Sequence, residues 1–147
     1  MEEAERRLLE NIKRYGYHIV VVGAEDTASP FAYTVGLFHK FHHPEIVVVG
    51  LGEDRLVDVL THVTEEIRDG ARFEAKKSYE DVFESHDCTF RRIAARHFQT
   101  HLPRALWYYD GFPFPALQLV WPDADGRYPW QSRVVRGLKQ LQPVLER

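Results

Sequence analysis

Two stretches of the chain carry apolar residues at helical spacing. The first stripe consists of Ala4, Leu8, Leu9, Ile12 and Tyr15. Gly16 follows it, where a left-handed residue would end a helix. The second stripe consists of Leu56, Val57, Leu60, Val63 and Ile67. Acidic residues precede this second stripe and Gly70 follows it, so the pattern predicts two amphipathic helices.

Short β-branched and aromatic runs fill much of the remaining chain and are typical of strands. They cover residues 18–23, 31–37, 46–51, 72–76, 79–84, 88–93, 115–121 and 127–130. Residues 95–109 favour a helix broken at Pro103, and a loose helix is expected after Gly137. The strands come in runs and do not alternate with helices. The sequence therefore predicts an α+β fold with a largely antiparallel or mixed sheet flanked by helices.

The length of 147 residues matches a single domain covering the whole chain. The net charge is −3, from 19 Lys and Arg against 22 Asp and Glu. Basic residues cluster only in short pairs, such as Lys76-Lys77 and Arg91-Arg92, and acidic residues are interleaved with them. A nucleic-acid-binding protein usually needs a concentrated positive surface, so no nucleic-acid partner is expected.

The chain has a single cysteine, Cys88, which excludes an intramolecular disulfide and favours a reducing compartment. The first residues are acidic, and no apolar segment typical of a signal peptide follows them. The longest aliphatic runs are much too short to span a bilayer. We therefore expect a soluble, cytoplasmic protein with no membrane partner.

Two segments carry a family resemblance. The first is Phe31-Ala32-Tyr33-Thr34-Val35-Gly36-Leu37, followed by His43-Pro44-Glu45. The second is Leu117 to Asp123, which includes Trp121-Pro122-Asp123, followed by Gly126 and Tyr128-Pro129-Trp130. Together they resemble a bacterial family catalogued as domain of unknown function number 4262, over roughly residues 10–130. This resemblance implies no particular activity.

The order of the first strands is also similar to the start of split-barrel flavin-binding proteins, which is a likeness of fold only. It implies a split-barrel-like sheet and a flavin as one candidate cofactor. Thr34 and nearby backbone N–H groups would then bind the cofactor phosphate, beside Tyr33, with Gly36 allowing a close approach. Alternatively, Tyr33 faces the core and Thr34 is an ordinary strand residue.

His43 and Glu45 lie two residues apart, so on an extended chain they share a face. Glu45 could orient His43 as a general base, which makes the two residues the candidate catalytic pair. In the alternative interpretation, the two residues belong to a loop-to-strand corner whose backbone is set by Pro44, and both polar side chains are in water.

Further histidines raise the question of a metal site. His39, His42 and His43 cluster, and His97 and His101 have the helical spacing of two zinc ligands. However, Phe98 stands where the general-base Glu of a zincin motif would be, and no second cysteine is present. We therefore assign no metal ligands, and Cys88 is expected to be a buried structural residue.

Trp121 and Trp130 flank a turn that contains Asp123, Asp125 and Gly126. The two indoles could face each other across this turn and wall a planar ligand, together with Asp123, or they could simply close the core.

The leading functional hypothesis is a cleft that binds a planar, anionic small molecule such as a flavin, between residues 33–37 and 121–130. The alternatives are a non-catalytic interaction or regulatory module and a metal-dependent hydrolase. The sequence does not decide whether the protein is an enzyme, and a homodimer is one of the open oligomeric states.

Overall fold

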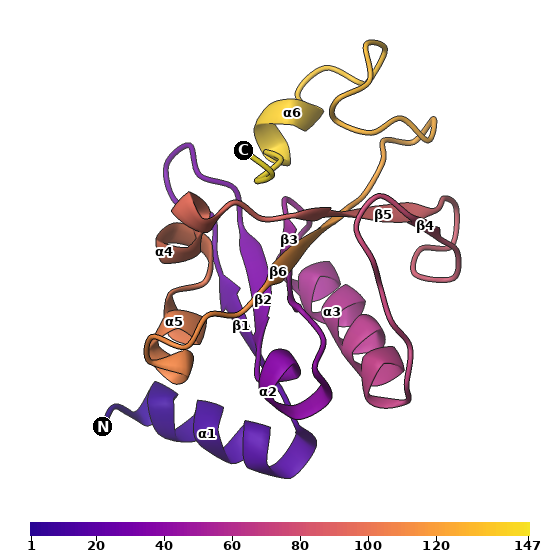
Figure 1. The fold of residues 1–147 in the computed structure, drawn as a ribbon. Helices are drawn as coiled ribbons and strands as arrows, with labels where there is room; N and C mark the ends of the chain where they lie inside the picture. Colours follow the sequence, from indigo (N-terminus) through magenta and orange to yellow (C-terminus); the bar gives the residue numbers. More distant parts are fainter.

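A six-stranded sheet organises the computed structural model, which describes all residues from 1 to 147 (Figure 1). The strands are β1 (His18–Val22), β2 (Phe31–Val35), β3 (Glu45–Val49), β4 (Ser78–Tyr79), β5 (Cys88–Arg92) and β6 (Ala116–Val120). The α-helices are α1 (Glu3–Tyr15), α2 (Leu37–Phe41), α3 (Glu53–Arg68), α4 (Phe98–His101), α5 (Pro103–Tyr109) and α6 (Leu138–Leu141). A single 3-10 turn, η1, covers Ala95–His97.

The strand order is β1-β2-β3-β6-β5-β4. All neighbouring strands are antiparallel except β3 and β6, which are parallel. The sheet is therefore mixed, and the α+β prediction is confirmed. The sheet stays open, with β1 and β4 at its edges, and does not close into a barrel.

Side chains alternate between the two faces of the sheet and form two cores. On one face, called the α3 face here, Ile46, Val48 and Leu119 pack with Leu56 and Leu60 of α3. The opposite face, called the α1/α5 face, is lined by buried residues of β2, β3, α1, α5 and the residue before α5, namely Tyr33, Val35, Val47, Leu8, Ile12, Ala105 and Leu102. Figure 1 shows α3 on one side of the sheet and α4 and α5 on the other.

The helices expected at both apolar stripes form. Gly16 ends α1 in the left-handed conformation (φ 92°), and a capping box at Glu2 begins this helix. The buried residues of α3 include Leu56, Leu60, Val63 and Ile67, but Val57 is 38% exposed and does not belong to the packed face. No helix combines the length and hydropathy needed to cross a membrane.

Three of the predicted strands, residues 72–76, 79–84 and 127–130, do not form as expected. Of residues 72–84, only Ser78 and Tyr79 form a strand. The N–H of Phe73 instead donates to the His43 ring and that of Glu74 to the Tyr79 hydroxyl. Residues 127–130 form no strand either. They belong to a loop in which the Arg127 N–H donates to the Asp123 carboxylate.

Candidate functional site

The turn between β2 and β3 is built around the carboxylate of Glu45, the first residue of β3, which is fully buried. Its donors are Thr34 Oγ1 (2.7 Å), the backbone N–H groups of Gly36 (3.1 Å), Leu37 (3.3 Å) and Phe38 (3.2 Å), and the Tyr109 hydroxyl. Three of these donors are the N–H groups at the start of α2, which have no partner within the helix. The carboxylate therefore serves as the cap of α2.

Gly36 provides the backbone conformation that this arrangement requires. Its φ of 105° lies in the left-handed region, which favours glycine. A Cβ atom at this position would lie 3.0 Å from Ile12 Cγ1 and 3.1 Å from the carbonyl oxygen of Gly16. The groups that come close to the Gly36 backbone are therefore Ile12 of α1 and Gly16, which ends this helix.

Burial raises the pKa of Glu45 to about 7. Hydrogen bonds from Tyr109, Thr34 and the α2 backbone act in the opposite direction, because they stabilise the ionised carboxylate. Burial and the neighbouring Glu45 carboxylate raise the pKa of Tyr109 above its usual range, so this phenol stays protonated and donates.

This raised pKa predicts a pH dependence of folding. The folded protein retains a proton that the unfolded chain releases at the ordinary carboxyl pKa of 4.5. The associated stability is complete below that pH and is lost as the pH rises through about 7. We expect the free energy of unfolding in urea to fall over this window in the wild type and to change less in Glu45→Gln. Parallel profiles for the two proteins would assign the titration to another group.

His43 is also buried and has both ring nitrogens engaged. Nε2 accepts a hydrogen bond from the Phe73 N–H (3.0 Å), so Nδ1 carries the proton and donates it to the Pro44 carbonyl (2.9 Å). Burial lowers the pKa of this imidazole, which favours its neutral form. His43 thus ties the segment after α3 to the corner before β3.

The catalytic role of His43 and Glu45 stays a prediction. The two residues do lie at the corner before β3, but the expectation that their side chains are in water is wrong, since both are buried. A general base must come within hydrogen-bond reach of the proton it removes. Both side chains are buried, and the hydrogen bonds of each go to backbone groups or hydroxyls of the protein itself.

Tyr33 and Thr34 are buried in the middle of the sheet. The Tyr33 hydroxyl accepts from the backbone N–H of Arg104 at the start of α5 (3.0 Å). Thr34 Oγ1 donates to Glu45 and accepts from the Ile46 N–H (2.9 Å). Both side chains therefore connect elements of the scaffold.

Trp121 and Asp123 follow β6 and organise the loop beyond it. The Trp121 indole donates to the Val49 carbonyl (2.8 Å). The Asp123 carboxylate accepts from the N–H groups of Asp125, Arg127 and Val135, each at 2.9 Å, and these bonds lower its pKa. Asp123 thus fixes the loop that carries Trp130.

Trp130 is the predicted site residue that remains open to solvent, with 41% of its surface exposed. Tyr128 stacks on it with ring centroids 5.2 Å apart, and the guanidinium carbon of Arg91 lies 4.3 Å from its ring centroid. Trp121 and Trp130 line different pockets, and β3 separates β2 from the strand that leads to Trp121. The structure therefore does not bring residues 33–37 and Trp130 to one cleft.

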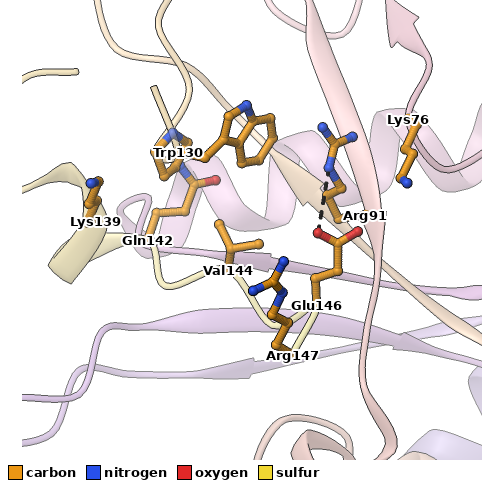
Figure 2. A pocket seen from close by; sticks show the side chains of 9 residues that line it. Lys76, Arg91, Trp130, Lys139, Gln142, Val144, Glu146 and Arg147 are labelled. Carbon is orange, nitrogen blue, oxygen red and sulfur yellow. Dashed lines mark ion pairs between the residues drawn. The ribbon is translucent and has the colours of Figure 1, made fainter. Parts of the chain in front are cut away.

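The pocket at Trp130, called the Trp130 pocket below, has a volume of about 820 Å³ (Figure 2). It is lined by Lys76, Arg91, Pro129, Trp130, Lys139, Gln142, Val144, Glu146 and Arg147. Four of these residues are cations, and Glu146 is the single acid, in a protein whose net charge is −3. Arg91 pairs with Gln118 of β6 in the sheet register, which places its side chain on the α1/α5 face.

Two buried glutamines hold the C-terminal segment that forms one wall of the Trp130 pocket. The Gln142 side chain accepts from the Trp121 N–H (2.9 Å) and donates to the Trp121 carbonyl (2.8 Å). The Gln118 side chain donates to the Pro143 carbonyl (2.9 Å) and accepts from the Leu145 N–H (2.8 Å). The segment is thereby fixed across the end of β6.

Sequence reasoning missed the cations of this pocket. Lys76-Lys77 and Arg91-Arg92 were recognised only as short basic pairs, and the polar tail only as a loose helix. The available signal was the alternation of β5, which puts Arg91 and Arg92 on opposite faces of the sheet.

The histidines of the two clusters contact other parts of the protein. No group of three or more His, Cys, Asp or Glu side chains is arranged to hold an ion. The rings of His97 and His101 are 6.2 Å apart, but His97 contacts the Arg147 carbonyl and His101 packs on Phe31. Cys88 is buried, which raises its thiol pKa to about 12.

Comparison with known proteins adds one finding. No curated protein and no solved structure matches the chain. A family model described as a domain of unknown function, DUF4262, matches residues 11–135, which is well over half of the sequence. The matched range includes the Glu45 corner and the loop with Trp121 and Trp130, and the chain belongs to this family.

Proposed function

We propose that the protein binds a small planar anion, such as a flavin nucleotide, in the Trp130 pocket. The observation that carries this proposal is the gathering of four cations around an exposed indole in a chain of net negative charge. Cations concentrated in a concave site attract anions and hold them by charge-assisted hydrogen bonds.

Arg91 is the residue best placed to receive an anionic group. Its guanidinium is held over the indole of Trp130 and lies 3.9 Å from a carboxylate oxygen of Glu146, as the dashed line in Figure 2 marks. An arginine offers a planar fork of N–H donors that matches a phosphate or carboxylate. A bound phosphate would take the position of the Glu146 carboxylate, beside Arg91 and Arg147, while Lys76 and Lys139 line opposite sides of the pocket (Figure 2).

The indole supports the planar part of the ligand. Tyr128 stacks on Trp130 and the Arg91 guanidinium lies over the same ring, so a planar ligand would contact the exposed part of the indole and stack on the guanidinium. Aromatic rings pack well on both kinds of surface. The pocket volume also falls in the range of roughly 300–1,000 Å³ that is common for small-molecule sites.

Isothermal titration calorimetry with flavin mononucleotide and riboflavin tests this proposal. The two compounds share the ring system, but only the first carries a phosphate. We expect flavin mononucleotide to bind at least about tenfold more tightly, and Arg91→Gln to remove at least about tenfold of its affinity, the size of one charge-assisted contact. Arg92→Gln is the matched control, since this neighbouring arginine is exposed and lies outside the Trp130 pocket.

Three results would contradict the proposal. They are the absence of binding by flavin mononucleotide, equal affinity for both compounds, and equal losses in the Arg91 and Arg92 variants. Inorganic phosphate alone should bind weakly and compete with flavin mononucleotide, because it occupies only the cationic part of the pocket.

A further inference from the structure

The first strand, β1, forms a complete open edge of the sheet. It pairs only with β2, and none of the backbone hydrogen bonds outside the regular elements involves residues 18–22. All five of its residues are half-buried. One row of its N–H and C=O groups therefore points away from the sheet and is available to another strand.

The strand at the other edge of the sheet, β4, is much shorter than β1. It consists only of Ser78 and Tyr79. Natural proteins protect long edges with Lys, Pro, bulges or a covering segment. The sequence His18-Ile19-Val20-Val21-Val22 contains no Lys and no Pro. A groove of about 610 Å³ lies between α1 and β1, lined by Ala4, Arg7, Asn11 and Tyr15 of α1, by residues 17–21 and by Arg104 of α5.

From this geometry we infer that two copies of the protein form a homodimer by antiparallel pairing of their β1 strands. A two-fold axis at the centre of β1 pairs Val20 with Val20 of the second copy. Ile19 then lies opposite Val21, on the α3 face, and His18 lies opposite Val22. These cross-strand pairs are apolar or uncharged, so the strand is complementary to itself.

Analytical ultracentrifugation tests the inference through a charge exchange at Val20. Val20→Lys and Val20→Glu each place two like charges opposite each other and should weaken the dimer at least about tenfold. A one-to-one mixture of the two variants should restore a dimer, because Lys then faces Glu. Val57→Lys is the control, since Val57 is 38% exposed on α3, and it should dimerise like the wild type.

The wild type decides the question even if a Val20 variant fails to fold. A dimer over about 5–500 µM, with amide exchange within residues 18–22 that slows as concentration rises, supports the inference. A monomer over that range overturns it and leaves the edge to a strand of another protein. A dimer that persists in both Val20 variants, or that the mixture fails to restore, also overturns it.

Discussion

Replacing Glu45 with alanine should lower the free energy of unfolding by about 3–5 kcal/mol. The carboxylate is fully buried and receives five hydrogen bonds, three of them from the first backbone N–H groups of α2. Removal leaves these donors buried without an acceptor, and each unsatisfied group costs about 1–3 kcal/mol, although the costs do not add fully. Urea unfolding followed by circular dichroism measures the loss.

Two variants set the scale for this experiment. Tyr109→Phe removes one donor to Glu45 together with the acceptor of the His39 N–H, and should cost about 1–2 kcal/mol. Glu66→Ala removes an exposed carboxylate and should change stability by less than about 0.5 kcal/mol. The loss in Glu45→Ala should be greater near pH 5 than near pH 8, because the wild type loses stability as its raised pKa is crossed. A loss below about 1 kcal/mol at both pH values would show that the corner holds without its carboxylate.

The Glu45 corner illustrates why sequence could mark these residues but not decide their role. Polar residues that interrupt aliphatic strands belong either to a ligand site or to a buried hydrogen-bond network. The difference depends on which groups surround the carboxylate. Tyr109 lies 64 residues away along the chain, and the donors of α2 exist only because Gly36 ends β2 in a left-handed conformation.

Local periodicity was sufficient for the helices α1 and α3 and for most strands, because each buries one face against a core. It was insufficient for the order of the sheet, since the parallel contact of β3 with β6 joins segments separated by α3 and α5. It also failed at residues 72–76, where the run is β-like but Phe73 donates to His43 in place of a strand partner.

The Trp130 pocket could not be predicted from local sequence patterns either, because its residues come from distant segments of the chain. Its cations come from the segment before β4, from β5 and from the C-terminal segment, and only the folded sheet brings them together. The sequence did mark Trp130, since it belongs to the family-like closing motif, Tyr128-Pro129-Trp130. The positions of the pocket's C-terminal cations depend on Gln118 and Gln142, which fix the C-terminal segment.

Gln142→Ala should therefore affect both stability and binding. Its side chain completes the hydrogen bonding of the Trp121 backbone, and its loss leaves a buried N–H and C=O without partners. We expect the free energy of unfolding to fall by about 2 kcal/mol. Affinity for flavin mononucleotide should fall at least about tenfold, because Lys139 and Arg147 lie on the segment that this side chain holds.

The control is Gln140→Ala, because Gln140 is exposed and lies in the same helix, α6, that leads into Gln142. It should leave both quantities unchanged. Limited proteolysis gives an independent readout, since a released segment is cut faster while the core stays protected. If Gln142→Ala lost stability but bound flavin mononucleotide normally, the tail would be part of the scaffold alone. The cations of Lys76 and Arg91 would then have to hold the anion without it.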